Sequence, residues 1–174
     1  NAGRNLLNPT KTPGENLSFL SFLTAIILGV HRNAGLLRAA IGSHSNDFRL
    51  GANEAPPAII SIFLGEQLTK ICNTLAEGKK LPRDAKDAFL DLGAQLPSLK
   101  QDHTDRNRTS PFAFTGNKFE FRAAGSRSSV SFPITCINAA VADGIDQLIK
   151  LIGEKKDVLT AIQEALNISS PIRF

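Results

Sequence analysis

Lysine, glutamate and arginine alternate with phenylalanine in one short segment, Lys118-Phe119-Glu120-Phe121-Arg122. This period of two predicts a β-strand that carries Lys118, Glu120 and Arg122 on one face and the two phenylalanines on the other. Two interpretations of the charged face are open. It is the solvated face of an antiparallel sheet, or a site where arginine binds a carboxylate or phosphate and glutamate holds a divalent metal.

A second group of charges lies just before this strand, in Asp105-Arg106-Asn107-Arg108-Thr109-Ser110. Two arginines in such a loop could bind phosphate oxygens during phosphoryl transfer. The alternative is an exposed turn held by salt bridges.

A third candidate is Glu54, which stands between Gly51-Ala52-Asn53 and Pro56-Pro57 in a polar loop. A flexible segment followed by a rigid one suits a flap that closes a carboxylate over a ligand. Equally, Asn53 could cap a helix, with Glu54 favourably placed in its first turn.

Helices should surround the strand and the loops. A capping box at Thr12 and Glu15 predicts a helix start, and apolar periodicity predicts the remaining segments. The expected elements are helices at Pro13–Arg32, Leu36–Ile41 (or a turn), Ile59–Leu75 with its end at Gly78, Ala85–Leu92, Ile137–Ile152 and Lys156–Leu166, a loop at Gly42–Pro57, and alternation from Phe112 to Phe132.

The composition is that of a globular domain, with 42% hydrophobic and 21% charged residues and a net charge of +4. This small excess of positive charge does not by itself indicate binding to nucleic acid. The apolar run from Leu17 to Val30 is too short for a membrane span and is expected to be a core helix. Cys72 and Cys136 fall on apolar helical patterns and are expected to be reduced and buried.

Three segments of the chain resemble consecutive segments of type III glutamine synthetases. They are GRNLLNPTKTPGEN, FRLGANEAPPAIISIFLGEQL and DRNRTSPFAFTGNKFEFR. Two long motifs in the right order are far more specific than a lone short pattern, and the similarity continues at lower density through almost the whole chain.

The resemblance implies an α+β fold with a mostly antiparallel curved sheet flanked by helices. Residues 1–174 would be the C-terminal portion of the catalytic domain. The implied enzyme is a glutamate–ammonia ligase that uses ATP and Mg²⁺ or Mn²⁺. In it the γ-carboxylate of glutamate attacks ATP, and ammonia then displaces phosphate from γ-glutamyl phosphate.

The same resemblance assigns roles to individual residues. Arg49 and Arg122 would hold substrate glutamate, Arg122 also contacting the transferred phosphoryl group, and Glu54 would be the flap glutamate. Arg108 would bind the ATP phosphates, with Lys118 near the nucleotide, and Glu120 would ligate the metal. Lysine at position 118 replaces a family arginine and loses its planar fork.

The chain also departs from the family pattern. Phe48 stands where a histidine is expected, Ala113 where other branches place an arginine, and Ser126–Pro133 matches poorly, so Arg127 receives no role. The family's N-terminal domain and earlier metal glutamates would precede Asn1, so the chain alone should be inactive. Family active sites form between identical subunits of a ring, here expected to be a dodecamer in the cytoplasm or an organelle stroma or matrix, without nucleic acid or membrane as partners.

Two other functions are weighed against the ligase. Arginines and lysine interleaved with phenylalanines could form an RNA-binding sheet, but Glu120 would repel phosphate and the strand does not fit the RNA-binding pattern. A glutamine synthetase relative that has lost its activity is the second alternative.

Overall fold

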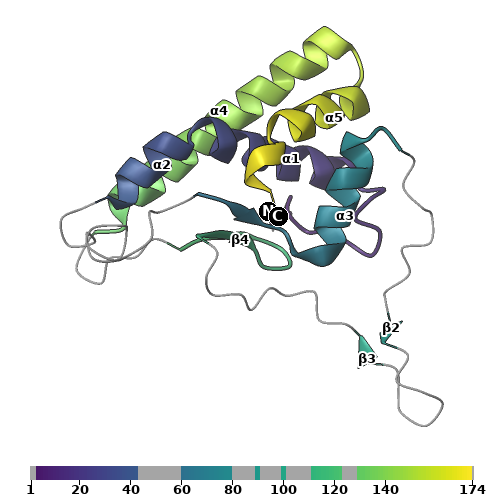
Figure 1. Cartoon of the computed structure of the whole chain (residues 1–174), viewed down its shortest axis with the longest axis horizontal. Coiled ribbons are helices and arrows are strands. Elements are labelled where there is room, and N and C mark those ends of the chain that lie inside the picture. Colours follow the sequence, from purple (N-terminus) through teal and green to yellow (C-terminus); the bar gives the residue numbers. More distant parts are fainter. Residues whose placement is uncertain are drawn as a thin grey trace.

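The computed structural model describes residues 3–42, 60–79, 89–90, 99–100, 111–122 and 129–173. These residues form a mixed arrangement of helices and short strands (Figure 1). In chain order the elements are α1 (Leu17–Arg32), α2 (Ala34–Ile41), β1 (Ile62–Phe63), α3 (Gly65–Ala76), β2 (Phe89–Leu90), β3 (Leu99–Lys100), β4 (Phe112–Phe114), β5 (Phe119–Phe121), α4 (Ser131–Lys155), α5 (Val158–Ile168) and the 3-10 helix η2 (Ser170–Ile172).

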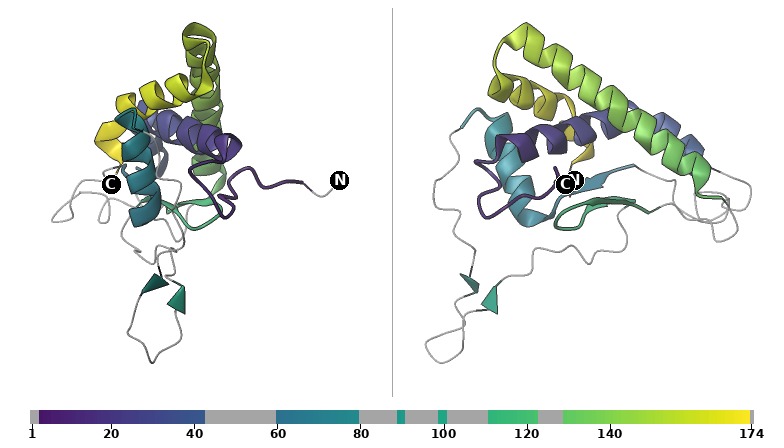
Figure 2. Two further views of the ribbon diagram at one scale, coloured as in Figure 1. Left: turned by 90° about the vertical axis from the view of Figure 1, so that its right-hand side faces the viewer. Right: turned by 180° about the vertical axis from the view of Figure 1, so that it is seen from behind.

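A three-stranded sheet with the order β1-β4-β5 supports the charged segment. Strand β1 runs parallel to β4, and β4 runs antiparallel to β5. Helices α1, α4 and α5 lie on the same side of this sheet in all the views (Figures 1 and 2). The expected α+β class is consistent with this arrangement, but within the described ranges the sheet is small and mixed, and a curved, mostly antiparallel sheet is not seen.

Helix α1 begins later than the sequence pattern predicts. Its N-cap is Asn16, whose side-chain oxygen accepts a hydrogen bond from the Phe19 amide at 3.1 Å. The Glu15 amide donates to the Thr12 carbonyl at 3.1 Å, which closes a turn ahead of the helix. The predicted capping box at Thr12 is therefore wrong, because Asn16 caps the first-turn amide instead.

The predicted helix from Ile59 is also wrong in its first part. Ile62 and Phe63 form β1, which pairs with β4 on one side, while Ile62 forms a bridge with Arg173 on the other. Helix α3 starts only at Gly65, whose φ of 78° allows the sharp corner between strand and helix. A short apolar run does not separate a buried strand from a buried helix by periodicity alone.

Two other predicted elements differ from the structure. Residues 89–90, predicted within a helix at Ala85–Leu92, form β2 and pair antiparallel with β3. Helix α4 starts at Ser131 rather than Ile137, so the alternating segment ends before Phe132. Proline in a first helical turn costs no intrahelical hydrogen bond, and Pro133 occupies such a position. The short helix at Leu36–Ile41 is confirmed as part of α2.

The core lies between these helices and the sheet. Helix α1 is buried over most of its length, as expected for the apolar run from Leu17 to Val30. Among the described helices, no single one is long and apolar enough to cross a membrane. Helices α1 and α2 together meet these criteria of length and composition, but the pair is bent by 70°. Cys72 and Cys136 are free and buried, as expected, and burial raises the pKa of the Cys72 thiol to about 11.

Asp143 of α4 connects that helix to the junction of α1 and α2. Its carboxylate accepts hydrogen bonds from Asn33 Nδ2 at 2.9 Å, Arg32 Nε at 3.2 Å and Gln147 Nε2 at 3.3 Å. The hydrogen bond from Asn33, aided by those from Arg32 and Gln147, holds the pKa of Asp143 below its ordinary value. A carboxyl with a lowered folded pKa stabilises the fold above its unfolded pKa of about 3.9, and this contribution is lost as the pH falls through the folded pKa.

We therefore expect Asp143→Asn to lower stability at pH 7 and to make little difference once the wild-type carboxyl is protonated. The side chain is 34% exposed, so the effect at pH 7 should stay below about 1 kcal/mol. The test compares the thermal unfolding midpoints of the two proteins at pH 7 and again at the lowest pH where both still fold. A difference in midpoint of the same size at both pH values would contradict this role of Asp143.

Candidate functional site

The β4–β5 hairpin is built by its turn. Thr115 and Lys118 flank the two turn residues Gly116 and Asn117, and the Thr115 amide donates to the Lys118 carbonyl at 2.8 Å. Gly116 has a φ of 86°. Hairpin turns with glycine at the first central position need this left-handed conformation, which glycine adopts without a steric penalty. The Gly-Asn pair therefore sets the register of the two strands.

That register divides the hairpin into an apolar and a charged face. Phe112 pairs with Phe121 and Phe114 with Phe119, so the four rings share one face. The rings of Phe112 and Phe119 stack with centroids 4.8 Å apart, and Phe114 also meets Phe19 of α1 at 6.0 Å. This apolar face therefore packs toward the helices.

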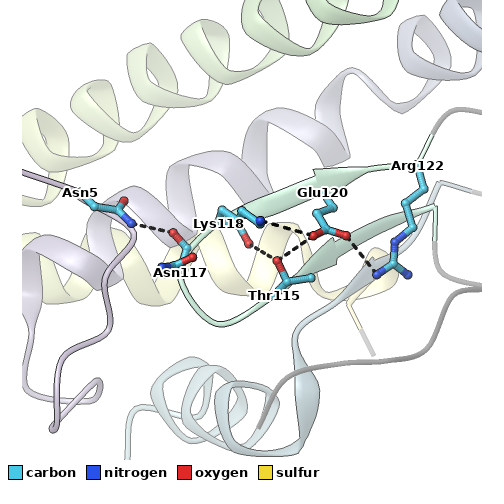
Figure 3. Close-up of polar contacts among 6 residues, drawn as sticks. All are labelled: Asn5, Thr115, Asn117, Lys118, Glu120 and Arg122. Carbon is cyan, nitrogen blue, oxygen red and sulfur yellow. Dashed lines mark hydrogen bonds and ion pairs between the residues drawn. The ribbon is translucent and has the colours of Figure 1, made fainter.

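The opposite face carries the predicted charges. Glu120 lies between two cations: its Oε1 is 3.8 Å from Lys118 Nζ and its Oε2 is 3.4 Å from Arg122 Nη2 (Figure 3). Ala113 lies directly across the strand pair from Glu120. The prediction that Lys118, Glu120 and Arg122 share one face is confirmed. We call these three residues the charged face.

The ion pairs of the charged face are open to exchange. The side chains of Lys118, Glu120 and Arg122 are 64%, 40% and 23% exposed. Ion pairs this exposed contribute little to stability, typically below about 1 kcal/mol each. A ligand can therefore compete for these groups at low cost, an anion for the cations and a metal for the carboxylate.

The fit of a divalent cation can be tested on the donor atoms. Mg²⁺ and Mn²⁺ prefer hard oxygen ligands, and a carboxylate such as Glu120 provides them. In the part of the chain that the structure describes, no three His, Cys, Asp or Glu residues gather as a metal-binding group. Glu120 thus fits as one ligand of such an ion, which commonly keeps several water molecules and takes substrate phosphate oxygens as further ligands.

The other predicted site residues cannot be placed. Arg49, Glu54, Arg106 and Arg108 lie outside the described residues. Their proximity to the charged face therefore stays a prediction.

Two residues near the charged face were not predicted from the sequence. Thr115 Oγ1 donates to Glu120 Oε1 at 3.3 Å, and Asn5 Nδ2 donates to the Asn117 carbonyl at 2.8 Å (Figure 3). The sequence does contain a local signal for the position of Thr115. In a hairpin with a two-residue turn, Thr115 faces Lys118 and is a diagonal neighbour of Glu120 on the same face. Asn5 gives no such local signal, because 112 residues separate it from its partner.

The charged face thus offers two partly exposed cations, which suit an anion, and one carboxylate, which suits a divalent cation as a single ligand. No family model matches the chain. The chain is 45% identical over 184 residues to a glutamine synthetase of Bacteroides fragilis, a match that covers 99% of the chain and 25% of the relative.

Two further relatives match over shorter segments. A type-3 glutamine synthetase of Dictyostelium discoideum is 52% identical over 144 residues, covering 82% of the chain and 20% of that protein. A glutamine synthetase of Butyrivibrio fibrisolvens is 49% identical over 129 residues, covering 74% of the chain and 18% of that protein. The resemblance to glutamine synthetases, including the type III branch, is confirmed. The chain spans a quarter or less of the length of these relatives.

Proposed function

We propose that this chain contributes the later half of the active site of a type III glutamine synthetase, which makes glutamine from glutamate, ammonia and ATP. One observation carries the proposal. The charged face places a carboxylate between a lysine and an arginine within a segment that resembles the family. Residues 1–174 would be the C-terminal portion of the catalytic domain, within a mostly antiparallel curved sheet larger than the one described.

The proposed reaction has two steps. The γ-carboxylate of glutamate attacks the γ-phosphorus of ATP, so that a new O–P bond forms and ADP leaves. Ammonia then attacks the acyl carbon, loses a proton and expels phosphate. Phosphoryl transfer depends on positioned cations and charge neutralisation more than on covalent help from the protein.

The chain's own residues would hold the substrates in this reaction. Arg122, the least exposed residue of the charged face, can bind the glutamate carboxylate and the transferred phosphoryl group through its guanidinium. Lys118 would neutralise charge near the nucleotide, and Glu120 would provide a metal ligand. A bound Mg²⁺ or Mn²⁺ supplies Lewis-acid stabilisation of phosphate charge.

The remaining roles rest on the resemblance alone. Arg49 would hold glutamate and Arg108 the ATP phosphates, while Glu54 would shield the acyl phosphate from water and help take a proton from ammonium. The complete site would form between identical subunits of a ring, a dodecamer, in the cytoplasm or an organelle stroma or matrix. This chain by itself would be inactive.

The structure gives no support to the RNA-binding alternative. RNA-binding sheets stack bases on aromatic rings exposed beside basic residues. Here the four rings of the hairpin lie on the face opposite the charges and pack on one another, and Phe114 also packs against Phe19 of α1. We therefore keep the ligase as the proposed function.

Coupling between the two steps tests the proposal at Glu54. We expect Glu54→Ala, in the native protein that contains this chain, to leave ATP binding intact and to lower glutamine formation at least about 10-fold, because water then reaches the acyl phosphate. The ratio of phosphate released to glutamine formed should rise well above one. Loss of ATP binding, or a ratio that stays at one, would remove Glu54 from the flap.

A further inference from the structure

Oε1 of Glu120 has a donor that the proposed reaction does not use. Thr115 Oγ1 lies 3.3 Å from this oxygen, on the same face of the hairpin. Lys118 Nζ also approaches Oε1, at 3.8 Å, but its side chain is 64% exposed and has four rotatable bonds. A threonine hydroxyl has one rotatable bond to the backbone and is stiff there. Thr115 is thus the donor whose position the hairpin itself fixes.

The hydroxyl proton of Thr115 is available for this role. The Lys118 carbonyl lies 3.5 Å from Thr115 Oγ1, but it already accepts the Thr115 amide at 2.8 Å. A hydroxyl donates one hydrogen bond, and one to an ionised carboxylate is stronger than one to a neutral carbonyl. Glu120 Oε1 is therefore the favoured acceptor.

The turn that carries Thr115 is itself anchored from the start of the chain. Asn5 Nδ2 donates to the Asn117 carbonyl at 2.8 Å, and Asn5 Oδ1 accepts from the Leu7 amide at 3.0 Å. Leu7 packs against the core. The anchor therefore connects the turn to the folded body.

We propose that Thr115 is a positioning residue that aims the Glu120 carboxylate at a divalent cation, and that Asn5 holds the turn in which Thr115 stands. Hydrogen-bond partners of metal-binding side chains orient the ligand atoms, and their removal typically weakens metal binding about 10- to 100-fold. Thr115 donates to Oε1 and Arg122 donates to Oε2, so each oxygen of the carboxylate has its own hydrogen-bond donor before a ligand binds. The proposal rests on the proposed function, since it takes Glu120 to be a metal ligand.

Mn²⁺ binding to the native protein that contains this chain, measured by calorimetry without nucleotide or glutamate, tests the proposal. Thr115→Val removes the hydroxyl and keeps the shape, so we expect an Mn²⁺ affinity about 10-fold lower with an unchanged thermal midpoint. Thr115→Ser keeps the hydroxyl and should bind within about 3-fold of wild type. Asn5→Ala leaves the hairpin residues untouched and should lower the affinity by a smaller factor.

The variants separate failure of this inference from failure of the proposed function. Glu120→Gln should lower Mn²⁺ affinity more than Thr115→Val, and adding Thr115→Val to it should cause no further loss, because the two residues act as one unit. If Glu120→Gln binds Mn²⁺ weakly but Thr115→Val binds as wild type, the positioning role is wrong and the metal assignment stands. If Glu120→Gln binds as wild type, the metal assignment itself fails. Should Thr115→Val not fold, wild-type affinity in Asn5→Ala together with weak binding by folded Thr115→Ser would overturn the proposal.

Discussion

Glu120→Gln, in the native protein that contains this chain, is expected to lower metal-dependent turnover at least about 100-fold, because the change removes a charged oxygen ligand from the metal. It also removes the negative charge that now lies between Lys118 and Arg122. The two cations would then repel each other across a neutral amide. Steady-state turnover at increasing Mg²⁺ concentration measures the effect, and high Mg²⁺ should restore only part of the activity.

A matched control is available on α5. Glu164 is also an exposed glutamate paired with a lysine, at 4.0 Å from Lys155 Nζ, but it lies outside the charged face. Glu164→Gln should leave turnover within about 2-fold of wild type, since an exposed pair of this kind contributes little. Near-normal turnover in folded Glu120→Gln would remove Glu120 from the site.

The second large effect concerns the contact between α1 and α4. At Gly144, a Cβ atom would lie 2.7 Å from the Gly29 nitrogen and 2.8 Å from the Gly29 Cα, and it would collide with the Ala25 carbonyl oxygen. These are backbone atoms of a buried helix, so no flexible side chain can move aside. We expect Gly144→Ala to lower the free energy of unfolding by about 3 kcal/mol, at the upper end for overpacking. Thermal unfolding at matched protein concentration measures the loss.

Gly153 gives the control in the same helix. A Cβ there would meet nothing within 4 Å. Alanine favours a helix more than glycine does, so Gly153→Ala should raise stability by about 0.5 kcal/mol. Opposite signs for the two glycine changes would follow from the close crossing alone. If Gly144→Ala were as harmless as Gly153→Ala, the tight α1–α4 contact would be wrong.

Local patterns predicted strand β5 better than the helix ends. The period of two from Lys118 to Arg122 fixed both faces of β5, because a strand has only two sides. The prediction for the start of α1 was wrong because Thr12 and Asn16 are both good N-cap residues, and only packing of the folded chain decides between them. Strand β1 was not predicted because Ile62 and Phe63 become a strand through pairing with β4, some 50 residues further along the chain.

The site was predictable to a similar extent. Side-chain types and spacing suffice to place Lys118, Glu120 and Arg122 together, since their neighbours in sequence are their neighbours in space. The anchor from Asn5 was beyond such reasoning, because nothing near Asn5 in the sequence indicates a partner 112 residues away. The relation of Arg49, Glu54 and Arg108 to the charged face is likewise long-range, and it remains a prediction from the resemblance.

The most direct test of the central claim is phosphate release from ATP by the native protein that contains this chain, with Mg²⁺ present and with glutamate or ammonium omitted in turn. A glutamine synthetase should release phosphate at full rate only when ATP, glutamate and ammonium are all supplied, with one glutamine formed for each phosphate. Release that does not depend on glutamate or ammonium, from intact and assembled protein, would contradict the proposed ligase and indicate a relative that has lost or changed its reaction.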